Sequence, residues 1–347
     1  MRTILDYLKE NECKMDTPNE VDALILGQLS YLNFENLIKN KRTHLLSKYK
    51  NNSDELCTDT LFPNKNKELL EAILTSPRFN NLKIAYLEST LNKDVQFCAM
   101  TFICNNHYFI VFRGTDLSVA GWIEDLNMSI NEAIPSYNMA IKYISNIIEK
   151  NQKNVYVIGH SKGGSIAVYG SIMLDKKYQD KLAGVYNFDG PGFKENLFKN
   201  EKYFNIRDKI YKYIPQNDVV GVLLNNSEKY QIIKSSSVGI MQHNSYSWIL
   251  DENDKFITLS KTNVTSRFFQ SITNTIINRI TDEEKEELII AIAKSFENAN
   301  IHSLLEFRRH FFKAIKSLLL PKNLSLIEIA DFAGLMWRIF KSIYFNR

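Results

Sequence analysis

Residues 155–170 read VYVIGHSKGGSIAVYG and decide the fold. The apolar run 155–158 has the composition of a strand buried inside a parallel sheet. The pentapeptide Gly159-His160-Ser161-Lys162-Gly163 follows it, and small residues then open a helical segment. A strand, a sharp turn and a helix in this order predict a nucleophile elbow centred on Ser161. The alternative is an ordinary tight turn that happens to contain a serine.

The residue types of this pentapeptide suit nucleophilic chemistry. Gly159 and Gly163 lie two positions before and after the serine, where a strained turn leaves no room for side chains. Ser161 Oγ would project above the sheet at the N-terminus of a helix. The helix dipole and the amide of Lys162 can stabilise an oxyanion there.

Strand and helix patterns alternate on both sides of this segment. The predicted helices are 21–38 and 136–150, and the predicted strands are 82–89, 95–104, 107–114, 182–190, 229–236 and 255–260. The pair Asn105-Asn106 predicts a turn between two antiparallel strands. The alternation predicts an α/β fold with a mostly parallel sheet flanked by helices.

The pattern becomes all-helical from about residue 260. Thr281 with Glu284, and Ser303 with Glu306, have the spacing of helix capping boxes. We therefore expect an α/β domain over 1–259 and a C-terminal helical extension over 260–347.

Composition excludes several classes of protein. The 347 residues include 43 basic and 39 acidic side chains, and the net charge of +4 does not by itself indicate nucleic-acid binding. The spacing of the 4 cysteines is that of neither a zinc site nor a redox pair, and no metal or organic cofactor is expected. So few cysteines fit a protein of a reducing compartment. Without a secretory signal or a long apolar run, we expect a cytoplasmic protein with no transmembrane segment.

A second segment, 109–126, carries a family resemblance. Its Phe112-Arg113-Gly114-Thr115 resembles the F-R-G-S/T sequence of the class 3 lipases, which are α/β-hydrolases. Trp122 and Asp125 match a Trp and an Asp in the family's next helix, and 159–163 matches its G-H-S-x-G, with Lys162 where Leu is usual. The resemblance covers about 18–250, points to a bacterial lipase-like branch of the family, and implies that Thr115 is the other oxyanion donor.

A catalytic triad needs a histidine and an acid after the serine in chain order. His302 and His310 lie in the helical tail, whereas His243 lies in a polar loop before the last predicted strand. We therefore predict His243 as the general base, with one nitrogen within hydrogen-bond reach of Ser161 Oγ. For the acid, Asn217-Asp218 resembles the family's N-D-x-V loop and favours Asp218, although the interval to His243 is short.

Asp189 and Asp208 compete with Asp218 for the role of acid. Asp189 follows a predicted strand but lies in the loop Asp189-Gly190-Pro191-Gly192, which also resembles the family. Asp208 lies in a helical pattern, which is more typical of a solvated residue.

Two further segments have open interpretations. Residues 116–130, including Asp116, Leu117, Trp122 and Asp125, are either a mobile lid or a fixed amphipathic helix. We expect Arg113 and Asp125 to pair at its base. The apolar segment 332–345 suits a packed helix better than peripheral membrane contact.

These patterns predict a serine hydrolase that cleaves small-molecule carboxylic esters, with an apolar acyl group, through an acyl-enzyme. An acyltransferase or thioesterase could use the same triad. The remaining alternative is a hydrolase-like binding protein without turnover.

Overall fold

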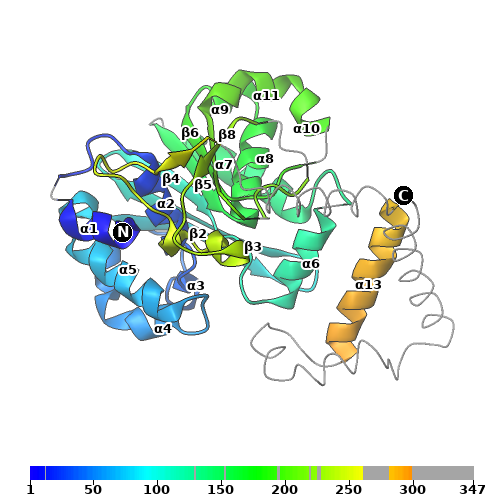
Figure 1. Cartoon of the computed structure of the whole chain (residues 1–347), viewed down its shortest axis with the longest axis horizontal. Coiled ribbons are helices and arrows are strands. Elements are labelled where there is room, and N and C mark those ends of the chain that lie inside the picture. Colours follow the sequence, from blue (N-terminus) through cyan, green and yellow to red (C-terminus); the bar gives the residue numbers. More distant parts are fainter. Residues whose placement is uncertain are drawn as a thin grey trace.

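The computed structural model describes residues 1–260, except 12, 129, 152–153, 194–195, 219 and 225–227, and residues 281–298. Within them the strands form one sheet in the order β1 to β9 (Figure 1). Their bounds are β1 His44–Leu45, β2 Lys83–Leu91, β3 Gln96–Cys104, β4 His107–Phe112, β5 Val155–His160, β6 Leu182–Phe188, β7 Ile210–Pro215, β8 Tyr230–Ile233 and β9 Thr258–Leu259.

The centre of the sheet is parallel and its margins are antiparallel. Strands β4 to β8 pair in parallel, while β1 to β4 and the pair β8–β9 are antiparallel. The predicted turn between β3 and β4 is confirmed, with positive φ values of 44° at Asn105 and 69° at Asn106. Asparagine tolerates this conformation, which the tight turns of hairpins require.

Helices cover both faces of the sheet, because neighbouring residues of a strand point to opposite sides. On β4, Phe109 and Val111 pack into one core, and Ile110 and Phe112 pack into the other. The first core contains α1 Ile4–Glu10, α2 Glu20–Leu29 and α5 Pro63–Thr75, and the second contains α7 Pro135–Lys150 and α8 Lys162–Met173. Figure 1 shows these two layers of helices.

Shorter helices lie in the connections. They are α3 Phe34–Leu37, α4 Ser53–Cys57, α6 Val119–Asn127, α9 Lys176–Gln179, α10 Asn196–Lys199 and α11 Glu201–Ile206, with the 3-10 turns η1 Leu46–Asn52, η2 Pro77–Phe79, η3 Arg207–Lys209, η4 Gly239–His243 and η5 Ser245–Ser247. The single helix predicted over 21–38 is therefore wrong: α2 ends at Leu29, and α3 begins at Phe34. The cause is Arg113, at the end of β4, which takes the carbonyls of Ser30 and Leu32 as hydrogen-bond acceptors.

The described part of the C-terminal region is the helix α13 Asp282–Asn298, which contacts α6. Thr281 and Glu284 form the predicted capping box, with hydrogen bonds of 3.0 and 3.2 Å. The second capping box, His302, His310 and the segment 332–345 lie outside the described residues. The boundary at residue 260 stays a prediction.

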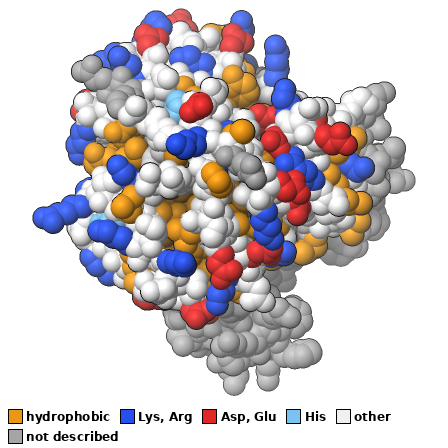
Figure 2. Space-filling view, turned by 90° about the vertical axis from the view of Figure 1, so that its left-hand side faces the viewer, with side chains coloured by type: hydrophobic (Ala, Val, Ile, Leu, Met, Phe, Trp, Pro, Cys, Tyr) orange, Lys and Arg blue, Asp and Glu red, His pale blue; other side chains and the backbone are white. Residues whose placement is uncertain are grey.

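The surface carries mixed charges. On the face shown in Figure 2, basic and acidic side chains are interspersed with apolar ones, as the small net charge of +4 leads one to expect. Among the described helices, none has both the length and the apolar character needed to cross a membrane.

Candidate active site

Ser161 lies at the sharp turn between β5 and α8, so the structure has the predicted strand, turn and helix. Its backbone φ of 57° and ψ of −135° are strained for a residue with a side chain. Two hydrogen bonds hold the turn, from Ser161 N to the Phe188 carbonyl at 2.9 Å and from Gly164 N to the Ser161 carbonyl at 2.8 Å. The adjacent strand β6 therefore helps to maintain a conformation that the turn alone would not favour.

The glycines of the turn are required by close backbone contacts. A Cβ at Gly159 would lie 2.0 Å from the Gly163 carbonyl oxygen, and a Cβ at Gly163 would lie 2.2 Å from the Phe112 carbonyl oxygen. Both distances are far below van der Waals contact, so a side chain at either position would force the elbow apart.

Thr115 lies just beyond the end of β4, beside the elbow. Its Oγ1 donates a hydrogen bond of 2.5 Å to Oδ2 of Asp125 on α6. Burial raises the pKa of Asp125 to about 6, against the opposing effects of Lys162 and of the Thr115 hydrogen bond. The Thr115 hydroxyl is thus held in one orientation next to Ser161.

The side chain of Lys162 is buried in an ion pair. Its Nζ donates to Oε2 of Glu124 at 2.9 Å, to the Gln96 carbonyl at 2.9 Å and to Oε1 of Gln96 at 2.5 Å. Lys162 is also the first residue of α8, so its backbone N–H has no acceptor within the helix. Only the backbone of this residue is therefore suited to receive an oxyanion.

Glu124 fixes the inner side of α6, the predicted lid. Its carboxylate accepts hydrogen bonds from Ser136 Oγ at 2.6 Å and from Gln96 N at 3.2 Å, besides that from Lys162. Trp122, on the outer side, is 48% exposed. These contacts fit a helix held in place better than a freely moving one, and lid motion stays a prediction.

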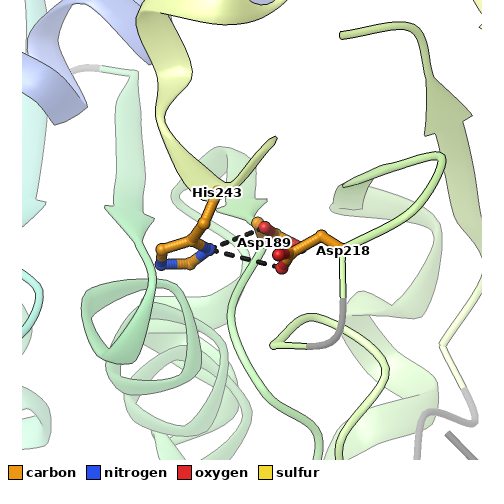
Figure 3. Close-up of side chains that lie close together, drawn as sticks. All are labelled: Asp189, Asp218 and His243. Carbon is orange, nitrogen blue, oxygen red and sulfur yellow. Dashed lines mark hydrogen bonds and ion pairs between the residues drawn. The ribbon is translucent and has the colours of Figure 1, made fainter. Parts of the chain in front are cut away.

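His243 lies at the end of η4 and faces two carboxylates (Figure 3). Its Nδ1 is 2.7 Å from Oδ2 of Asp189 and 3.5 Å from Oδ2 of Asp218. Both carboxylates are fully buried, whereas the competitor Asp208 has a side chain 85% exposed. The shorter contact of His243 is therefore with Asp189, while the predicted acid Asp218 faces the same nitrogen, and the assignment of the acid stays a prediction.

The predicted hydrogen bond between Ser161 Oγ and His243 is not formed. The two residues line the same cavity, and the second ring nitrogen of His243 points away from both carboxylates (Figure 3). Contacts between catalytic groups are often loose without substrate and tighten when it binds.

His160 connects the elbow to the loop of His243. Its Nε2 lies 2.9 Å from the His243 carbonyl oxygen, and its Nδ1 lies 3.0 Å from the hydroxyl of Tyr31. Burial and the nearby His243 lower the pKa of His160 to about 3, so the ring is neutral. Because a carbonyl only accepts, the single ring proton is on Nε2, and the Tyr31 hydroxyl donates to Nδ1.

A cavity of about 620 Å³ opens beside Ser161. Of the predicted lid residues, Asp116, Trp122 and Asp125 line it, and Leu117 does not. Much of its remaining wall is apolar and includes Leu61, Phe62, Leu126, Val220, Leu223 and Leu224. Its size is within the usual range of small-molecule sites.

Arg113 does not pair with Asp125, contrary to the prediction. Its guanidinium donates to Oε2 of Glu35 at 2.8 Å and to the carbonyls of Ser30 and Leu32. Glu35 is partly buried, which opposes ionisation, but the Arg113 guanidinium holds the pKa of that carboxyl below its ordinary value. Arg113 thus ties the α2–α3 corner to β4, and Asp125 is left for Thr115.

Sequence reasoning missed Tyr31, Glu35 and Glu124. The first two lie in a segment whose apolar spacing suggested only a core helix, and no motif marked them. A lysine in the apolar start of α8 could have indicated Glu124, because a buried cation requires an acidic partner.

One group among the described residues has its possible ligand atoms close enough for a metal ion, namely Asp189, Asp218 and His243, within 4.8 Å of one another. The His243 Nδ1 in this group takes part in the 2.7 Å hydrogen bond to Asp189. A nitrogen that donates a proton has no lone pair for a metal, so the observed arrangement of these three residues is a hydrogen-bonded cluster.

Comparison with known proteins gives the family of this chain. The family model for Mbeg1-like proteins matches residues 73–294, a range that contains the elbow, both acids and His243. The chain belongs to the Mbeg1-like family. This is a lipase-like family, and the Mbeg1-like chain has an α/β fold with a mostly parallel sheet flanked by helices.

Solved structures similar to this Mbeg1-like chain include lipases. M37 lipase is 16% identical at a TM-score of 0.40, covering 60% of this chain and 71% of its own. The lipase of Rhizomucor miehei in its propeptide complex is 16% identical at a TM-score of 0.38, covering 67% and 81%. Lip2 lipase from Yarrowia lipolytica is 14% identical at 0.33, covering 45% and 66%. The search of curated proteins found no significant match.

Proposed function

We propose that this protein is a serine hydrolase that cleaves small-molecule carboxylic esters with an apolar acyl group. The observation that carries the proposal is Ser161, held at a strained turn on the wall of an apolar cavity that His243 also lines. Strained backbone of this kind persists where the surrounding structure enforces it, and it concentrates at functional sites.

The reaction would proceed through an acyl-enzyme. Ser161 Oγ attacks the acyl carbonyl while His243 Nε2 takes its proton, and the same nitrogen then protonates the leaving alcohol. The buried carboxyl groups at Nδ1 fix the imidazole tautomer and stabilise the imidazolium. The backbone N–H groups of Lys162 and Thr115 hold the oxyanion of the tetrahedral intermediate, and water then attacks the acyl-enzyme with His243 as base and releases the acid.

Covalent labelling with a fluorophosphonate, together with a series of p-nitrophenyl esters of increasing chain length, tests this function. The wild type should be labelled and should hydrolyse the esters, and Ser161→Ala should lose both activities. Ser47→Ala is the matched control, because Ser47 is exposed in η1. Equal labelling of Ser161→Ala and wild type would contradict the proposal. No labelling of a folded wild type would favour a binding protein without turnover.

A further inference from the structure

The site holds one more acid than a triad needs. Asp189 and Asp218 both lie against Nδ1 of His243, and both are fully buried. They come from different elements, since Asp189 follows β6 directly and Asp218 lies in the loop after β7. Asp189 has a positive φ of 57°, equal to that of Ser161 on the adjacent strand end. The fold thus holds Asp189 in a strained conformation at this position.

One positive charge, that of a protonated His243, faces both carboxylates; burial opposes this charge, but the two carboxylates raise the pKa of the ring to about 10. Among the described residues, no lysine or arginine forms an ion pair with Asp189, and its Oδ1 is buried without a hydrogen-bond partner. The other titratable groups facing this cluster are His160, which is neutral, and Asp125, which carries no positive charge. Two like charges in one buried site are unfavourable, so one of the two carboxyl groups should keep a proton.

The surroundings distinguish the two acids. Oδ2 of Asp218 accepts a backbone hydrogen bond of 2.9 Å from Val220 N, which favours its ionised form. Burial opposes this ionisation, but hydrogen bonds with His243 and Asp189 lower the pKa of Asp218. Burial and the neighbouring charge of Asp218 raise the pKa of Asp189 well above its ordinary value. The proton therefore belongs on Asp189.

We propose that Asp189 and Asp218 work as one acid unit, in which Asp218 carries the charge and Asp189 is a neutral positioning residue. Oδ2 of Asp189 lies against Nδ1 of His243, and the carboxyl proton of Asp189 is shared with the neighbouring carboxylate of Asp218. This rests on the proposed function, since it assigns a role within the same site.

The consequence for His243 follows from charge. Two ionised carboxylates beside Nδ1 would keep the imidazole protonated, and a protonated ring cannot accept the proton of Ser161. A single shared charge leaves His243 able to gain and lose a proton while two groups orient its ring.

Asparagine is the informative substitution, because at position 189 its oxygen can still accept from Nδ1–H while the side chain can no longer ionise. Asp189→Asn should lower kcat/KM for the esters about tenfold, the effect of one weakened hydrogen bond, without moving the acidic limb of the pH profile. Asp218→Asn should lower it about 100-fold at pH 7 and shift the acidic limb to lower pH, because the pKa of His243 falls when the charge of Asp218 is lost. The double variant should lose about 10⁴-fold. Asp208→Asn, on the exposed acid, is the control and should match the wild type.

Two results would overturn the acid unit. One is a loss of about 10⁴-fold in Asp189→Asn, which would make Asp189 the single charged acid. The other is an Asp218→Asn variant as inactive as the double variant, together with an Asp189→Leu variant as active as the wild type. Thermal melting of each variant shows whether it is folded.

A titration of His243 by nitrogen-15 NMR separates this proposal from the proposed function, because it needs no turnover. The His243 signal is assigned by its loss in His243→Gln. Its pKa should be above the ordinary value in the wild type and in Asp189→Asn, lower in Asp218→Asn and lowest in the double variant. This order in a protein without esterase activity would keep the acid unit and reject the hydrolase. An equal fall in both single variants would reject the acid unit.

Discussion

The two sides of Ser161 are built on different electrostatic principles. On the oxyanion side, the buried charge of Lys162 is matched by Glu124, and both are enclosed between α6 and α8. On the histidine side, two buried carboxyl groups face one imidazole. In the proposed reaction the first arrangement keeps its charges throughout, whereas the second changes its protonation. A hydrolase site needs both, a fixed field for the oxyanion and an adjustable one for the proton.

Removing the base should break the adjustable side and leave the fixed side working. His243→Ala should lower kcat by about 10⁴- to 10⁶-fold, and a residual rate over the uncatalysed reaction should persist from the oxyanion side. Single-turnover kinetics with an activated p-nitrophenyl ester measure this remaining activity. A variant with no rate above the uncatalysed reaction would show that the two sides do not act separately.

Removing the Lys162 cation should disrupt the ion pair of the fixed side and so lower the stability of the fold. Lys162→Met leaves the Glu124 carboxylate buried without its partner, and the free energy of unfolding should fall by about 3–5 kcal/mol. Urea denaturation measures the change, and Lys162→Met with Glu124→Gln should recover a large part of it. Lys176→Met is the control, because Lys176 pairs with Asp180 at the exposed surface. Equal stability of the control and Lys162→Met would mean that the buried pair does not hold α6.

Removing the anchor of one proposed oxyanion donor should affect turnover alone. Thr115→Val keeps the shape of the side chain and the backbone N–H but removes the hydroxyl that donates to Asp125, so the segment that carries this N–H loses its anchor and kcat should fall about tenfold with little change in KM. Steady-state kinetics on the ester series test this expectation. A rise in KM with unchanged kcat would place Thr115 in substrate binding instead.

The pH dependence of the free energy of unfolding should reflect the titration of Asp125. Its pKa of about 6 in the folded protein lies above the ordinary value of 3.8, so the folded state binds more protons between these values. Wild-type stability therefore falls through this contribution as pH rises from about 4 to about 6. Asp125→Asn lacks this contribution, and its melting temperature relative to wild type should rise over the same window. A difference independent of pH would contradict the raised pKa.

The smallest effect is expected at the mouth of the cavity. Trp122 is about half exposed, so Trp122→Ala should change the melting temperature little and should raise KM severalfold for the longer esters only. A uniform rise across chain lengths would mean that Trp122 does not contact the acyl chain.

The local parts of this structure could be predicted from sequence, and the long-range parts could not. The elbow at Ser161 and the turn at Asn105-Asn106 depend on a few adjacent residues, whose backbone requirements are visible in their types. The partner of Arg113 lies 78 residues away, and nothing in the spacing distinguishes Glu35 from Asp125.

The choice between Asp189 and Asp218 shows the limit most clearly. Both follow neighbouring parallel strands, so both were bound to reach the same edge of the sheet. Asp189 lies 2.7 Å and Asp218 lies 3.5 Å from Nδ1 of His243. This difference depends on how the two loops pack and not on any pattern in the chain.

The contacts of the segment around Tyr31 have a consequence for how the chain reaches this structure. Tyr31 bonds to His160 across 129 positions, and Arg113 bonds to Ser30 across 83. Closing such long loops is slow, because their entropy is lost before the contacts form. During synthesis, the segment that orients the elbow emerges first and waits for the strand that it will support. Assembly of the site should therefore be a late event, after the hairpin of β3 and β4, whose contacts are local.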